Sequence, residues 1–126
     1  MVRIELIEYL NLSSLNHLRT LRLDELKHPA IQSILATLPN PVPLKRLTLA
    51  VEFNHVGHFV NKSYASLDEF LASEKFPDAM EIWLDYKGSL NDDQVQGKLS
   101  RVFRRVHEKG VLGISRVVRE YYDGSN

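Results

Sequence analysis

The sequence predicts an α/β fold: a short, irregular solenoid whose parallel β-sheet carries helices on one face. Three observations support this prediction. Leucines in LRTLRLDEL, residues 18–26, follow the spacing L-x-x-L-x-L-x-x-L. A similar spacing returns in PLKRLTLAVEF, residues 43–53, and in FPDAMEIWLDY, residues 76–86. Between these strand-like segments lie segments with the apolar periodicity of helices.

The spacing is that of a leucine-rich repeat, in which one repeat supplies one strand and stacking of repeats buries the leucines. The second copy places Leu44, Leu47 and Leu49 at the repeated positions, and the third places Ala79, Ile82 and Leu84 there. A sheet built in this way keeps one face open. Solenoids of this kind commonly use the open face to bind other proteins.

Composition sets only broad limits. The chain has 126 residues, enough for one domain with a modest core, so we assign residues 1–126 to a single domain. Residues 1–12 are expected to form an N-terminal cap or an extra strand, and residues 123–126 a flexible tail. With 44% hydrophobic and 25% charged residues, the chain is globular in composition. Its 16 basic and 16 acidic residues balance, so net charge favours neither nucleic acid nor membrane.

Cysteine usage and hydropathy point to a cytoplasmic or nuclear protein. The chain has no cysteine, which excludes disulfides and thiol chemistry. No apolar run approaches the roughly 18 residues of a membrane span, so we expect no membrane partner. The first ten residues, MVRIELIEYL, carry three charges and no small-residue cleavage site, unlike a signal peptide.

The first half of the chain predicts two strands and a helix. Residues 19–24 form a strand with Leu21 and Leu23 inward. A helix begins at His28-Pro29, where proline is tolerated in the first turn, and Pro39-Asn40-Pro41 stops it. A second strand covers residues 45–53. The apolar stripe of the helix comprises Ile31, Ile34, Leu35 and Leu38.

The second half continues the alternation after a polar loop, residues 54–63. Ser66-x-x-Glu69 has the spacing of a capping box and predicts the start of a short helix that ends near Lys75. A strand follows over residues 80–86. Asn91, with Gln94 three residues on, is expected to cap the longest helix, residues 92–109, with Gly110 just past its end. The apolar face of that helix comprises Val95, Leu99, Val102 and Val106, and a last strand covers residues 112–121.

The resulting βαβαβαβ order requires parallel strands with right-handed crossovers. A doubly wound three-layer sandwich is the rival architecture, and it would need strands that are apolar on both faces. In the strands TLRLDE and RLTLAVE, apolar and polar residues alternate instead. One face of the sheet is therefore expected to be exposed to solvent, which favours the solenoid. Irregular repeat lengths argue against a regular horseshoe.

Two longer segments resemble one protein family. SLDEFLASEKFPDAMEIWLDY and LSRVFRRVHEKGVLGI resemble segments in the C-terminal leucine-rich-repeat region of F-box/leucine-rich-repeat proteins of mushroom-forming fungi. The resemblance covers roughly residues 12 to 118. It implies the substrate-recognising half of a ubiquitin-ligase adaptor, or a stand-alone relative. The F-box, which docks the ligase scaffold, has no counterpart in this sequence, so the resemblance does not imply ligase recruitment.

Candidate metal and catalytic residues are few. His55-x-x-His58, with Asn54 and Asn61 nearby, could begin a zinc or nickel site, but such sites need three or four protein ligands. We therefore predict a polar loop, no metal and no cofactor. There is no G-x-S-x-G, no phosphate-binding glycine loop and no H-E-x-x-H, and the adjacent acids at residues 24–25 and 92–93 do not converge on one reacting atom. The prediction is a protein that is not an enzyme.

A basic cluster near the C-terminus supports an alternative function. Its excess of positive charge could attract a phosphate backbone, which would make the chain a nucleic-acid-binding domain. Phe103 is the one aromatic residue among these cations, so there is no repeated aromatic interleaving. A solvated outer helix face explains the cations as well, so nucleic acid is the less favoured partner. The cluster comprises Lys98, Arg101, Arg104, Arg105, Lys109, Arg116 and Arg119.

The open sheet face is the favoured site, and a protein is the favoured partner. Aligning the repeats on their leucines places Arg22, Thr48 and Trp83 in one outward row. Thr20, Arg46 and Glu81 precede that row, and Asp24, Ala50 and Asp85 follow it. A tryptophan flanked by charges is the residue mix enriched at binding hot spots. The predicted partner-binding residues are Arg22, Arg46, Thr48, Glu81, Trp83 and Asp85.

Two alternatives for Trp83 remain open at this point. It could pack under a loop, or a register shifted by one residue would turn it into the core. The ends of a short solenoid also leave apolar surface and unpaired strand edges. These need caps or partners, so self-association through the ends is a further expectation.

Overall fold

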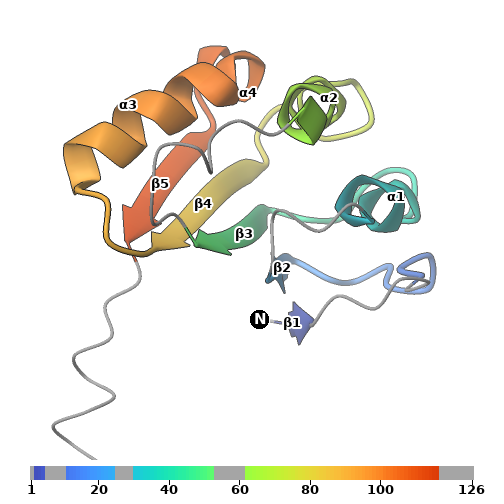
Figure 1. Cartoon of the computed structure of the whole chain (residues 1–126). Helices are drawn as coiled ribbons and strands as arrows, with labels where there is room; N and C mark the ends of the chain where they lie inside the picture. Colours follow the sequence, from blue (N-terminus) through green and yellow to red (C-terminus); the bar gives the residue numbers. More distant parts are fainter. Residues whose placement is uncertain (1, 5–10, 25–29, 53–61, 117–126) are drawn as a thin grey trace, which may run out of the picture.

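A computed structural model shows a parallel sheet with helices along it (Figure 1), and it describes residues 2–4, 11–24, 30–52 and 62–116. The sheet has the order β1-β2-β3-β4-β5, and every neighbouring pair is parallel. Each strand therefore lies beside the next strand in sequence. The strands are Val2–Ile4, Thr20–Leu23, Arg46–Glu52, Glu81–Lys87 and Leu112–Arg116.

Within the described residues, four helices follow strands β2, β3 and β4, and they lie on the same side of the sheet in Figure 1. Helix α1 (Ile31–Ala36) follows β2, α2 (Lys62–Leu71) follows β3, and α3 (Asp92–Val102) with α4 (Arg104–Glu108) follows β4. The predicted α/β class with a parallel sheet is confirmed. Residues 1–12 contain the short strand β1. The predicted helix start at 28–29, the end of the last strand at 117–121 and the tail at 123–126 lie outside the described residues.

The core lies between the sheet and the helices. Leucine-spaced strand residues point into it, and none of the six predicted ones is more than 2% exposed. Removing this apolar surface from water is the main driving force for the layer. The six are Leu21, Leu23, Leu47, Leu49, Ile82 and Leu84. From α1 and the turn after it, Ile31, Ile34, Leu35 and Leu38 enter the same cluster.

Helix α2 begins earlier than the sequence predicted. It starts at Lys62, so the proposed capping box at Ser66 was wrong, and it ends at Leu71 rather than near Lys75. The buried residues Tyr64, Leu67 and Leu71 follow helical spacing, which extends the amphipathic pattern upstream of Ser66. The Ser66 hydroxyl instead donates to Gln32 of α1, at 3.0 Å.

The longest predicted helix is interrupted at Phe103, so the prediction of one helix over residues 92–109 was wrong. Phe103 has φ −104° and ψ 49°, outside the helical region, and its side chain is fully buried. Its ring packs against Tyr64, with centroids 5.6 Å apart. The predicted ends are confirmed: Asn91 accepts the Gln94 backbone N–H at 2.8 Å, and Gly110 has φ +77°.

A buried carboxylate begins α4. Asp68 of α2 is only 5% exposed, and its two oxygens accept the backbone N–H groups of Arg105 and Val106 at 3.1 and 3.0 Å. The first N–H groups of a helix lack partners within the helix, and an acceptor from another element can satisfy them. Asp68 therefore fixes α4 against α2. Nearby, burial raises the pKa of Tyr64 to about 12.

Among the helices that the structure describes, none has the length and apolar character of a membrane span.

We expect Leu47→Ala to lower the free energy of unfolding by about 2–5 kcal/mol, because Leu47 is fully buried and its removal leaves a cavity. Denaturant unfolding measures this. Thr48→Ala is the matched control one residue along β3, since Thr48 is half-buried on the other face. A loss of less than 1 kcal/mol at Leu47 would contradict the packing.

Asp68→Ala should lower the free energy of unfolding by about 1–3 kcal/mol, because it leaves one buried and one part-buried N–H group without an acceptor. Amide hydrogen exchange should also become faster at Arg105 and Val106. The neighbouring Glu69→Ala, at an exposed position, is the control. Unchanged exchange at both amides would show that Asp68 does not hold the start of α4.

Candidate functional site on the open sheet face

The open face carries the outward residues in the predicted rows. Across β2, β3 and β4, Arg22 pairs in register with Thr48, and Thr48 with Trp83. Arg46 lies opposite Glu81, and Ala50 opposite Asp85. Because alternate residues of a strand point to opposite faces, burial of the leucines sends these side chains away from the helices. The shifted register that would bury Trp83 is therefore wrong.

These rows form a shallow hollow that we call the sheet-face depression. Its volume is about 240 Å³. Thr48 lies on the central strand β3, with side chains from β2, β4 and β5 around it. The lining residues are Arg22, Arg46, Thr48, Trp83, Asp85 and Ser115.

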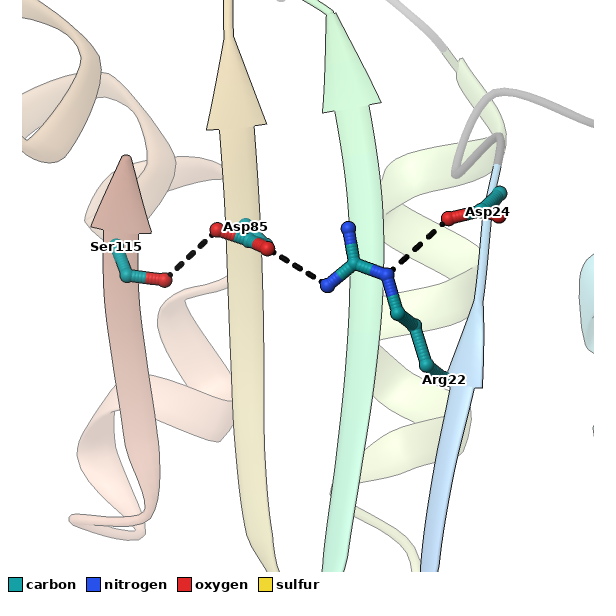
Figure 2. A network of polar contacts seen from close by, with 4 residues as sticks. All are labelled: Arg22, Asp24, Asp85 and Ser115. Carbon is teal, nitrogen blue, oxygen red and sulfur yellow. Dashed lines mark hydrogen bonds and ion pairs between the residues drawn. The ribbon is translucent and has the colours of Figure 1, made fainter. Parts of the chain in front are cut away.

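A polar network fixes one side of the depression (Figure 2). The Arg22 side chain reaches across β3 and donates to Asp85 at 2.6 Å and to Asp24 at 3.3 Å. Ser115 donates to the other oxygen of Asp85, at 2.9 Å. The Arg22 side chain is 18% exposed, so the guanidinium is largely shielded from water and held in one orientation.

Trp83 and its neighbours form the other side. The Arg46 guanidinium lies over the indole, 5.2 Å from the ring centroid. One oxygen of Glu81 accepts both the Trp83 indole N–H and an Arg46 N–H, each at 2.9 Å. The hydrogen bond from Trp83, followed by the hydrogen bond and charge of Arg46, lowers the pKa of Glu81, which keeps this carboxylate ionised.

Gly113 makes room for the indole. It lies opposite Trp83 in the β4–β5 ladder, and a Cβ atom at this position would come within 2.6 Å of Cδ2 of Trp83. Any side chain here would force the ring to move. The indole therefore lies against the β5 backbone and remains half-buried, with a large apolar group presented on a polar face.

The six predicted partner-binding residues are thus brought together, although their role in binding stays a prediction. Arg22, Arg46, Thr48, Trp83 and Asp85 line the depression, and Glu81 supports Arg46 and Trp83. Sequence reasoning missed Ser115 and Gly113. Strand alternation could have found both, because extending the outward rows to β5 places Gly113 beside Trp83 and Ser115 beside Asp85.

The structure describes only some residues of the other two candidate sites, the histidine pair and the basic cluster. His55 and His58 lie outside the described residues, and the described ranges contain no group of three or more potential metal-ligating side chains. In the basic cluster, Lys109 is ion-paired with Asp78 at 3.6 Å. Arg119 and the Arg116 side chain are not described. The remaining members, Lys98, Arg101, Arg104 and Arg105, are exposed on α3 and α4.

Comparison with known proteins returned no match among protein-family models, curated proteins or solved structures.

Gly113→Ala should displace the indole, because the added methyl occupies the space of the ring. The chain has a single tryptophan, so its fluorescence reports this position directly. We expect a red-shifted emission and stronger acrylamide quenching. Gly97→Ala is the matched control, since a Cβ there meets nothing within 4 Å. Identical spectra for Gly113→Ala and the unsubstituted protein would contradict the placement of Trp83 on β5.

Proposed function

We propose that this chain is a non-catalytic protein-interaction module that binds a protein partner on the open sheet face. The observation that supports this proposal is the placement of Trp83 on the open face. This residue is a half-buried aromatic side chain, seated on Gly113 and surrounded by charged groups that are already held in place. Tryptophan gives a partner a large, rigid contact, and fixed charges around it orient the partner at little cost in entropy.

The size of the depression favours a protein over a small molecule. Its volume of about 240 Å³ is below the ~300–1,000 Å³ typical of small-molecule sites. A hollow of this size takes one side chain of a partner whose remaining surface lies on the flanking strands.

We propose further that the architecture is a short, irregular leucine-rich-repeat solenoid related to the C-terminal region of fungal F-box/leucine-rich-repeat proteins. Strict succession of the parallel strands and a shared side for the helices support the solenoid. Self-association through the sheet ends belongs to the same proposal. Light scattering over a concentration series tests it, and a monomer at all concentrations would contradict it.

A second candidate function is nucleic-acid binding by the basic outer surface of α3 and α4. The observation that favours it is the exposure of Lys98, Arg101, Arg104 and Arg105, which make no ion pair within the part of the chain that the structure describes. Lys109, by contrast, is neutralised by Asp78. This candidate requires affinity for DNA or RNA that falls steeply with salt concentration.

Affinity capture from the native source, followed by mass spectrometry, identifies the partner on which the proposal is tested. Trp83→Ala should then weaken binding by about 2 kcal/mol or more, as truncation of a hot-spot residue does. The fold should survive, because Trp83 is not part of the buried core cluster. Isothermal titration calorimetry measures the affinity, and far-UV circular dichroism checks the fold.

Arg104→Ala is the matched control on the helix side of the sheet and should leave this affinity unchanged. The nucleic-acid candidate predicts the reverse ranking, with an Arg104 effect that grows at low salt. Loss of the fold in Trp83→Ala would show instead that Trp83 is a core residue.

A further inference from the structure

We infer that the sheet-face depression accepts a carboxylate side chain, so that the partner presents an aspartate or glutamate to Arg46 and Thr48. This inference rests on the proposed function, because it names the chemistry of the partner that would occupy the same site. It is drawn from the hydrogen-bonding groups that the depression leaves unused.

The carboxylate that lines the depression is already occupied at both oxygens. Asp85 is the one carboxylate among the lining residues, and its two oxygens accept from Arg22 and Ser115. Glu81 borders the depression without lining it, and one of its oxygens accepts from both Arg46 and Trp83, which leaves the other oxygen as the one carboxylate acceptor nearby without a partner among the described residues. An incoming ammonium group would therefore compete with internal donors, and it would approach two guanidinium groups of like charge.

Donors, in contrast, remain available. Arg46 uses only Nη2, in its pair with Glu81, and its Nε and Nη1 have no partner among the described residues. The Thr48 hydroxyl and Nη2 of Arg22 also have none there. A carboxylate accepts several such bonds at once, and charge-assisted bonds to it are stronger than bonds to a neutral amide.

Glu81 acts as an internal competitor in this arrangement. Its carboxylate holds one edge of the Arg46 guanidinium in the free protein, while the side chains of both residues stay about half exposed, 51% and 47%. A partner carboxylate must share Arg46 with Glu81 or displace it. Weakening the internal pair should therefore strengthen binding of an acidic partner, and it should weaken binding of a basic one.

Short peptides test this chemistry without knowledge of the partner. The probes are acetylated, amidated pentaglycines whose central residue is replaced by glutamate, glutamine or lysine. The readout is the indole N–H resonance of the single tryptophan in ¹H–¹⁵N spectra. We expect the glutamate peptide to shift this resonance and to bind at least about fivefold more tightly than the glutamine peptide. The lysine peptide should produce no saturable shift.

Three variants of the full chain complete the test. Arg46→Gln should abolish the preference for glutamate. Glu81→Gln, which keeps an acceptor for the indole N–H, should tighten binding of the glutamate peptide by about threefold or more. Arg104→Gln on α4 is the control and should change neither. A pentaglycine with a free C-terminal carboxylate that outcompetes the glutamate peptide would overturn the assignment to a side chain.

The inference is overturned if the lysine peptide binds more tightly than the glutamate peptide, if none of the peptides shifts the indole resonance, or if Glu81→Gln weakens glutamate binding. Failure of the proposed function is distinguishable from these outcomes. If the affinity of a captured partner depends on Trp83 but not on the charge of Arg46, the proposed interaction module is supported and the proposed carboxylate ligand is contradicted. If the affinity changes in neither the Trp83 nor the Arg46 variant, both proposals are contradicted.

Discussion

Parallel strands in register send alternate side chains to opposite faces of one sheet, and this constraint governs the rest of the chain. One face receives Leu21, Leu47 and Ile82, and helices must cover it to keep these residues from water. The other face receives Arg22, Thr48 and Trp83 from the same strands. The same alternation of side chains therefore produces both the core and the candidate site. A shift of the strand register by one residue would disrupt both.

The strands were the most predictable part of the fold, because leucine spacing marks both their positions and their inward faces. Helix boundaries were less predictable. The upstream start of α2 depends on Tyr64 packing against Phe103, a contact between residues far apart in sequence. The break in the last helix depends on Asp68, which supplies the acceptors for a second helix start. The break could not be predicted from residues 92–109 alone, because the acceptor comes from another helix.

The outward rows could likewise be predicted from the sequence, because pairing of each strand with the next one in sequence aligns equivalent positions of the repeats. The conformations of the side chains could not. Arg22 spans β3 to reach Asp85, and Trp83 extends sideways onto β5 rather than outward. The first depends on Asp85, two strands away and itself bonded to Ser115, and the second depends on Gly113 of the adjacent strand. The sequence thus indicated where polar groups gather, while the structure shows which donors remain unused.

Covalent footprinting of the complex distinguishes a partner bound on the open sheet face from one bound on the helices. Oxidative labelling of the free chain and of the chain bound to its captured partner, read by mass spectrometry, compares the two sides of the sheet in one experiment. Binding on the open sheet face predicts strong protection of Trp83, with unchanged labelling of exposed residues on α3 and α4, such as His107. Protection confined to α3 and α4, with Trp83 labelled as in the free chain, would contradict it.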